Sequence, residues 1–220
     1  MSDVPNPPVP LTQSRGIPSA QGESGPGARG RVNTVLVTAS TTGYRDLAER
    51  LVRSALKFGV VVESLGYEST GDWVKNGHIK PQTILASMLA SDRRRPVCWI
   101  DADAELMAAP KALDGISGAD VAVCRLATKE VLSGTVWFAP TPGAMWLLAA
   151  WHDECRAHPS MWDQHALYKA MSRARAPIKV AELDHSLCFI PGTSPPCRKG
   201  SPVIVHHQAS REVRAGTRSM

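Results

Sequence analysis

Residues 97–106 read VCWIDADAEL, a short apolar run that ends in a pair of aspartates. Four apolar residues in a row, Val97 to Ile100, are typical of a strand buried on both faces. Asp101 follows at the carboxyl end of this strand, and Asp103 lies two residues further on. Residues two apart in an extended chain project to the same side, so we expect both carboxylates to converge on one hard cation. The small Ala102 between them leaves room for a ligand.

Strand-like and helix-like runs alternate on both sides of this segment. Gly59 is expected to end the first helix and Pro81 to lie in the first turn of the second. Helices between strands imply right-handed crossovers, so the pattern predicts an α/β fold with a mostly parallel central sheet and helices on both faces. The expected strands are residues 34–39, 60–65, 97–100, 119–124, 135–139, 178–182 and 203–205, and the expected helices are residues 42–58, 79–90, 142–156 and 162–172.

Composition predicts one domain with a tail at each end. A chain of 220 residues that is 43% hydrophobic can bury one core but hardly two. Residues 1–32 are rich in Pro, Gly and Ser, and residues 212–220 also lack apolar content, so both are expected to be disordered. We therefore place a single domain at residues 33–211.

The composition also limits the cellular location and the binding partners that we expect for the protein. The chain has no apolar run of the roughly 18–20 residues that a membrane span needs and no signal-peptide pattern, which predicts a soluble, cytoplasmic protein. Its five cysteines include no C-x-x-C pair, which argues against a disulfide framework or a zinc knuckle. The net charge of +5 favours polyanionic partners, including nucleotides and nucleic acid.

Five segments, in this order of elements, resemble the GT-A type nucleotide-diphospho-sugar transferase family, including its glycogenin-like members. They span most of residues 34–211 and are KPQTIL (80–85), VCWIDADAEL (97–106), SGTVWFAPTPGAMWLL (133–148), WDQHAL (162–167) and VIVHHQASR (203–211). The resemblance implies a single GT-A/Rossmann-like domain and a hexosyltransferase-type glycosyltransferase with a nucleotide-diphosphate sugar as donor. Similarity to glycogenin-like enzymes implies retention of anomeric configuration, although the sequence offers no residue that we name as the nucleophile.

The resemblance also implies a metal site. In such families the D-x-D carboxylates, here Asp101 and Asp103, bind Mn²⁺ or Mg²⁺, and a late histidine, here His206 or His207, completes the site. An imidazole ligand favours Mn²⁺ over Mg²⁺. The alternative is structural, because an aspartate often caps the next segment and a histidine pair often ends a surface strand.

Further site residues follow from the same family pattern. Asp163 and Gln164 resemble its D-Q pair, which faces the sugar-binding cleft, although an aspartate there also stabilises a helix start. Lys80 resembles the basic residue that faces the donor, and its alternative is an exposed helix lysine. Gly134 lies in a segment that resembles the family's N-S-G, which approaches the sugar or the acceptor. Leu132 stands where Asn is common, so a side-chain amide contact is not expected.

The loop after the first strand is expected to receive the base and ribose of the donor. It offers the hydroxyls of Thr38, Ser40 and Thr41, which are also ordinary helix-capping residues. Arg211 follows the histidines and either pairs with phosphate or belongs to the tail.

Six tryptophans are many for this length. Four of them, Trp99, Trp137, Trp146 and Trp151, fit core positions. Trp73 and Trp162 lie near expected loops or helix starts, which makes them candidates for stacking on a sugar or a base.

Two other function classes stay open at this level. One is a catalytically silent module that binds nucleotide sugars or nucleic acid. The other is a metal-dependent phosphoryl or nucleotidyl transferase, which the absence of a P-loop motif disfavours. The sequence does not specify the acceptor, and the basic charge is compatible with a modified base in DNA, for which binding should weaken steeply with salt.

Overall fold

The computed structural model describes residues 32–173, 177–197, 200–209 and 211. The tails expected at residues 1–32 and 212–220 lie outside the described residues, with the exception of Val32. That side chain packs against the core.

In the described part of the chain, six strands form the central sheet. They are β1 (Val35–Ser40), β2 (Val62–Gly66), β3 (Val97–Ile100), β5 (Val121–Arg125), β6 (Val131–Phe138) and β7 (Val180–Glu182). Their order is β2-β1-β3-β6-β5-β7. All run in one direction except β6, which is antiparallel to both of its neighbours. The expectation of a mostly parallel sheet is therefore confirmed, with β6 as the exception.

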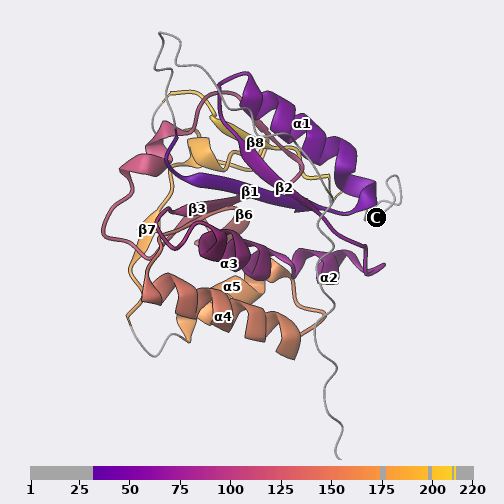
Figure 1. The fold of residues 1–220 in the computed structure, drawn as a ribbon, viewed down its shortest axis with the longest axis vertical. Helices are drawn as coiled ribbons and strands as arrows, with labels where there is room; N and C mark the ends of the chain where they lie inside the picture. Colours follow the sequence, from indigo (N-terminus) through magenta and orange to yellow (C-terminus); the bar gives the residue numbers. More distant parts are fainter. Residues whose placement is uncertain (1–31, 174–176, 198–199, 210, 212–220) are drawn as a thin grey trace, which may run out of the picture.

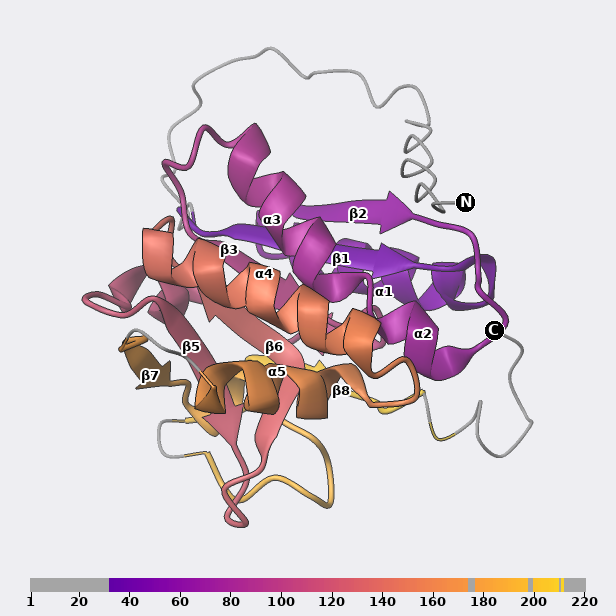
Figure 2. The ribbon, with the colours of Figure 1, turned by 90° about the horizontal axis from the view of Figure 1, so that it is seen from below.

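Different elements cover the two faces of the sheet (Figure 1). One face carries α1 (Arg45–Leu56) and a small antiparallel sheet of β4 (Ala104–Leu106) and β8 (Ile204–His206). The other face carries α3 (Lys80–Ala90), α4 (Pro142–Ala157) and α5 (Asp163–Ser172). Figure 2 looks onto this second face, where the three helices lie across the strands. The two cores on either side make the sheet the middle layer, as expected.

Local sequence explains most of these elements. In α1, Leu47, Leu51 and Ala55 are buried at helical spacing. The helix is followed by Gly59 at φ 70, the left-handed conformation that lets a chain leave a helix, as the sequence predicts. Every residue of β3 is buried, because sheet neighbours flank it and helices cover it.

Three elements differ from the expectation. β6 starts at Val131 rather than Thr135, because pairing with β5 continues through Leu132 despite the polar residues and glycine that follow. The short α2 (Trp73–Gly77) has too few residues for a periodic pattern and is fixed by Asp72, whose side chain accepts hydrogen bonds from two backbone amides at its start. β4 forms only because β8, about a hundred residues later in the chain, pairs with it.

No helix within the described ranges is long and apolar enough to cross a lipid bilayer.

Candidate active site

Two adjoining cavities lie at the carboxyl ends of β1 and β3. The first, of about 120 Å³, is bounded by the end of β1, the residues after β2 and α2. The second, of about 270 Å³, is bounded by β6, the start of α5 and the segment around β8. Five residues line both cavities: Trp73, Lys80, Asp101, Asp103 and Asp163. The acidic residues expected to bind a cation therefore stand between the two cavities.

Asp101 and Asp103 converge, although by another route than the one expected. Residues 102–103 form a turn rather than extended chain, and the amide of Ala104 donates to the carbonyl of Asp101 over 3.0 Å. The amide of Asp101 is held by the carbonyl of Gly134 at 2.8 Å. Tight turning after β3 thus replaces the strand periodicity that the sequence suggested.

One oxygen of each carboxylate is held by the protein. Oδ1 of Asp101 accepts a hydrogen bond from Nε1 of Trp99 at 2.7 Å and lies 2.8 Å from Nζ of Lys80. Oδ2 of Asp103 accepts from the amide of Ala209 at 2.8 Å. In the described part of the chain no hydrogen bond is found for Oδ2 of Asp101, and Oδ1 of Asp103 faces Nδ1 of His206 at 3.8 Å.

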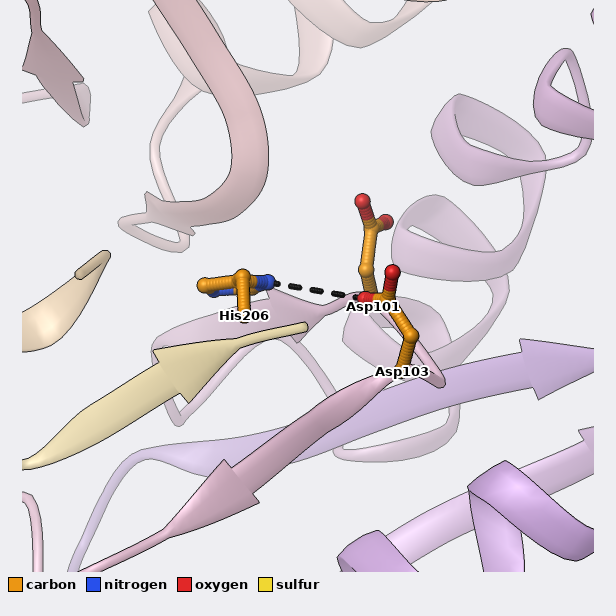
Figure 3. A group of neighbouring side chains, drawn as sticks. All are labelled: Asp101, Asp103 and His206. Atoms are coloured by element: carbon orange, nitrogen blue, oxygen red, sulfur yellow. Dashed lines mark ion pairs between the residues drawn. The ribbon is translucent and has the colours of Figure 1, made fainter. Parts of the chain in front are cut away.

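The structure brings His206, and not His207, to the aspartates. One nitrogen of His206 and one carboxylate oxygen of each aspartate all lie within 4.8 Å of one another, and Nδ1 of His206 is 3.8 Å from Oδ1 of Asp103. Figure 3 shows the ring of His206 directed at the carboxylate of Asp103, with the side chain of Asp101 beside it. His207 lies next in the chain but points elsewhere, with Nε2 3.5 Å from Oε2 of Glu105 and 41% of its side chain exposed. Successive residues of a strand face opposite sides, which explains the choice between the two.

Lys80 is buried in the wall between the cavities. Its ammonium group lies 2.8 Å from Oδ1 of Asp101 and 2.8 Å from Oδ2 of Asp163, and it donates to the hydroxyl of Ser133 at 3.2 Å. It also lies 5.7 Å from the ring centre of Trp99, within range of a cation–π interaction. Lys80 is therefore not the exposed helix lysine of the alternative interpretation. Its ammonium group is paired with two carboxylates of the protein, so its charge does not act on a ligand alone.

Asp163 is the first residue of α5, and it faces the cavities rather than capping the helix. Its Oδ2 accepts a hydrogen bond from the hydroxyl of Ser133 at 2.7 Å in addition to the contact with Lys80. Gln164 lines the second cavity, where its Nε2 donates to Oε1 of Glu130 at 2.6 Å and its Oε1 accepts from the amide of Ser133. The D-Q pair therefore meets β6 at Ser133.

Burial and charge shift the acid–base properties of this cluster. Burial alone would lower the pKa of Lys80, but the carboxylates of Asp101 and Asp163 outweigh it and raise the pKa above its ordinary value. Burial raises the pKa of Asp101, an effect that Lys80 partly offsets. Burial also acts on Asp103, but the neighbouring His206 and the amide of Ala209 lower its pKa overall.

Two glycines permit this close packing. A Cβ atom at Gly134 would lie 3.0 Å from Cε1 and 3.1 Å from Nδ1 of His206, and 3.4 Å from Oδ2 of Asp101. A Cβ atom at Gly77 would lie 3.0 Å from Oδ1 of Asp163. Side chains at either position would occupy space that the site residues now fill.

Two of the three residues expected to contact the donor from the end of β1 line the first cavity. Ser40 and Thr41 line the first cavity, and the hydroxyl of Thr41 is buried without a hydrogen-bond partner among the described residues. Thr38 is fully buried inside β1 and does not line either cavity, because its strand position directs it into the core. Ala102 lines the first cavity, as expected of a residue that leaves room for a ligand.

Arg211 is exposed and lies outside the linings of both cavities. The structure therefore does not bring it to the site. The one described contact of this residue is its amide, which donates to the carbonyl of Gln208.

The aromatic candidates lie at the edge of the cavities. Trp73 lines both, Trp162 lines the second, and their rings meet edge to face with centres 5.5 Å apart. Trp162 also stacks on His165, with ring centres 5.6 Å apart, and 38% of it is exposed. Of the tryptophans assigned to the core, Trp99 has a second role, since it lines the first cavity and binds Asp101.

The chain matches the family model described as nucleotide-diphospho-sugar transferase over residues 99–220, more than half of its length. The chain belongs to this family. It is therefore a glycosyltransferase, and the resemblance of its motifs to that family is confirmed. No curated protein matches the sequence of this transferase.

Solved structures show the same fold. The transferase is similar to a glycosyltransferase involved in the glycosylation of the major capsid of PBCV-1, with a TM-score of 0.61 and 15% identity over 83% of this chain and 98% of that one. It is also similar to GlyE of Streptococcus pneumoniae TIGR4, with a TM-score of 0.54 and 12% identity over 80% of this chain and 55% of that one. The bifunctional glycosyltransferase WbbM has a TM-score of 0.52 and 11% identity over 80% of this chain and 46% of that one.

Several site residues of the transferase carried no signal in the sequence. Tyr67, Asn76 and Tyr44 line the first cavity from three different segments, and only the fold brings them together. Glu130, directly before β6, lines the second cavity because the strand begins earlier than its apolar pattern indicates.

Proposed function

We propose that this glycosyltransferase transfers a sugar from a nucleotide-diphosphate donor to an acceptor hydroxyl, with a divalent cation held by Asp101, Asp103 and His206. The observation that carries the proposal is the convergence of these three side chains within 4.8 Å at the wall shared by two cavities. That wall is where a diphosphate would join a nucleoside in one cavity to a sugar in the other.

The donor set fits a divalent cation. Two carboxylate oxygens and one imidazole nitrogen are ligands that suit Mn²⁺. Lys80 contacts the carboxylates of Asp101 and Asp163, and Asp103 lies near Asp101 with His206 as its basic neighbour. Three carboxylates and one ammonium group leave an excess of two negative charges when His206 is neutral. A doubly charged cation balances that excess, and when bound it would neutralise negative charge on the diphosphate leaving group.

The first cavity supports binding of the nucleoside. Its walls combine aromatic rings, Tyr44, Tyr67 and Trp73, with polar groups after β1, which suits a flat base and a hydroxylated ribose. The buried hydroxyl of Thr41 gains a hydrogen-bond partner if a ligand fills this space. We place Ser40 and Thr41 against the donor and leave out Thr38, which is fully buried.

The buried ion pairs around Lys80 give this residue a positioning role. It holds Asp101 on one side and Asp163 on the other, so the cation-binding carboxylate and the start of α5 keep a fixed separation. We propose that Asp163 and Gln164 then face the transferred sugar or the acceptor from the second cavity, whose lining they share with Gly134.

The second cavity supports an acceptor that presents a hydroxyl group. Glu130, Asp163 and Gln164 offer hydrogen-bond acceptors and an amide, and Trp162 offers an apolar ring face at the edge. Sugars and bases both stack on such a ring.

DNA that carries a modified base stays a prediction for the acceptor. If the protein contacts several phosphates, its association constant for DNA should fall about a thousandfold between 50 and 200 mM salt. Association insensitive to salt would remove this acceptor.

The test uses two adjacent histidines as a matched pair. Purified protein is incubated with a panel of nucleotide sugars, Mn²⁺ and candidate acceptors, and release of nucleoside diphosphate is measured. We expect Asp103→Asn and His206→Ala to lower the rate by about a hundredfold or more, since each removes a ligand of the charge-neutralising cation. His207→Ala, one residue away and paired with Glu105, should retain the rate within about twofold.

Equal losses in the two histidine variants would contradict the proposed ligand set. Saturable donor binding without turnover of any donor would instead favour a silent module, and release of a nucleoside monophosphate would favour nucleotidyl transfer. Retention of configuration stays a prediction, which the anomeric coupling constant of the product tests.

A further inference from the structure

Gln208 combines a strained backbone with a place in the wall of the second cavity. It follows the two histidines at the end of β8, and its φ of 55° lies in the left-handed region. Residues with a Cβ atom rarely adopt that region, which glycine enters without cost. In the described part of the chain, the other non-glycine residues with positive φ are Asp92, Arg93 and Lys129, in the connections α3–β3 and β5–β6. Those three line neither cavity, whereas Gln208 lines the second.

The hydrogen bonds around Gln208 explain why the backbone turns here. The amide of His207 donates to the carbonyl of Asp103 at 3.3 Å, and the amide of Ala209 donates to Oδ2 of the same aspartate at 2.8 Å. The amides on either side of Gln208 thus close around Asp103, with the left-handed residue between them. A glycine would meet this requirement at lower cost, so the backbone does not explain why a long amide side chain occupies the position.

The side chain of Gln208 carries a buried acceptor without a partner. Its Oε1 is shielded from water and receives no hydrogen bond from the residues that the structure describes. Buried polar groups are nearly always paired, and an unpaired one destabilises the folded protein. The last torsion of a glutamine side chain is broad, so an amide that no hydrogen bond holds turns toward the cavity at little cost. Gln208 is therefore suited to receive a hydrogen bond from a ligand in the second cavity.

The surroundings of Gln208 indicate which ligand supplies that hydrogen bond. The second cavity is rich in acceptors, since Glu130 and Asp163 line it and the amide of Gln164 already donates to Glu130. A phosphate oxygen is a further acceptor and does not pair with Oε1, whereas a hydroxyl group donates to it. Gln208 also flanks Asp103 and lines the second cavity but not the first, which is the side where the proposed function places the sugar.

We propose that Gln208 is a specificity residue of this transferase, whose Oε1 accepts a hydrogen bond from a hydroxyl group of the transferred sugar. This inference rests on the proposed function, because it takes the second cavity as the place of that sugar. It adds a contact outside the metal ligands and the D-Q pair. A donor whose sugar lacks the hydroxyl group leaves Oε1 unsatisfied and is rejected.

The first experiment separates the sugar from the rest of the donor. In the presence of Mn²⁺, titration calorimetry measures the binding of UDP-, GDP- and dTDP-linked hexoses and of UDP, GDP and dTDP to the full chain. We expect Gln208→Met, which keeps the length but loses the acceptor, to bind the preferred nucleotide sugar about tenfold more weakly. The matching nucleoside diphosphate should stay within about twofold of the wild type. Gln82→Met, on the exposed side of α3 and outside both cavities, should change neither affinity.

The second experiment identifies the hydroxyl group. Analogues of the preferred nucleotide sugar, each deoxygenated at one ring position, replace it in the same titration. We expect one analogue to bind the wild type about tenfold more weakly than the parent does, and Gln208→Met to bind the two within about twofold of each other. Gln208→Gly, which also relieves the left-handed backbone, should bind like Gln208→Met and unfold at a urea concentration no lower than the wild type does. It keeps the test in place if the methionine variant fails to fold.

The possible failures are distinguishable. If the wild type binds none of the nucleotide sugars, the proposed function fails and the role of Gln208 fails with it. If the wild type binds one and both variants of Gln208 bind it equally well, the role of Gln208 alone is refuted. Equal losses for the nucleotide sugar and the nucleoside diphosphate, or weaker Mn²⁺ binding in electron paramagnetic resonance, would place Gln208 at the diphosphate or the cation and overturn its assignment to the sugar.

Discussion

Gly134→Ala should weaken metal binding far more than it destabilises the fold. The added Cβ atom would lie 3.0 Å from Cε1 and 3.1 Å from Nδ1 of His206. Ordinary carbon contacts are about 3.5–4.0 Å, so the ring or the strand has to move by about 0.5 Å. Metal–ligand distances tolerate only about 0.2 Å, which makes that displacement large for a ligand. We therefore expect at least about a tenfold loss of Mn²⁺ affinity.

The effect on stability is expected to be smaller because two contributions oppose each other. Overpacking costs about 1–3 kcal/mol. Replacing a glycine whose φ is not positive restricts the unfolded chain, which stabilises the folded protein by about 0.4–1 kcal/mol. The net loss in the free energy of unfolding should thus be about 0–2.6 kcal/mol, measured by urea denaturation of the metal-free protein.

Gly66→Ala is the matched control for this variant. Gly66 ends the edge strand β2 and has no atom within 4 Å of the position of an added Cβ. Its Mn²⁺ affinity, measured by electron paramagnetic resonance, should stay within about twofold of the wild type. A Gly134→Ala protein that is folded and binds Mn²⁺ like this control would refute the reasoning that β6 packs closely against a proposed metal ligand, His206.

Three further predictions concern the surroundings of the site. Lys80→Met leaves buried carboxylates unpaired and should lower the free energy of unfolding by about 3–5 kcal/mol in denaturant titrations, whereas the exposed Lys75→Met should change it by less than about 0.5 kcal/mol. Burial of Glu154 opposes its ionisation, but two basic partners lower its pKa overall, so it stabilises the fold at neutral pH and loses that contribution as pH falls through the lowered pKa. The difference in unfolding free energy between wild type and Glu154→Gln should therefore shrink toward acid pH, and a difference independent of pH would argue against the ion pairs. Trp162→Ala should raise the KM for acceptor about tenfold without changing the KM for donor, and Trp146→Ala, equally exposed on α4, should change neither.

The sequence predicts elements best where a single segment determines its own structure. α1 shows its buried stripe in the spacing of its apolar residues, and β3 shows its burial in four consecutive ones. β4 and α2 have no such pattern, because β4 depends on pairing with β8 and α2 is five residues long. The antiparallel direction of β6 could not be predicted either, because an apolar strand has the same sequence pattern in parallel and antiparallel pairs.

The same distinction holds within the candidate site. Asp101 and Asp103 come from one segment, so their convergence was predictable, although a turn rather than strand periodicity produces it. The choice of His206 over His207 required the register of β8 against β4, which pairs Ala104 with His206. That register is a property of two segments together, and no spacing within either one specifies it.

The buried cluster also explains why its parts depend on one another. Lys80 stays charged in the interior because two carboxylates surround it, and the same ammonium keeps Asp101 in place beside Asp103. Ser133 links Lys80 to Asp163, so β6, α3 and α5 meet at one point. A cation bound between Asp101 and His206 would act on this network directly, since it would compete with Lys80 for the charge of Asp101. We therefore expect donor and metal binding to affect the start of α5, which lines the second cavity.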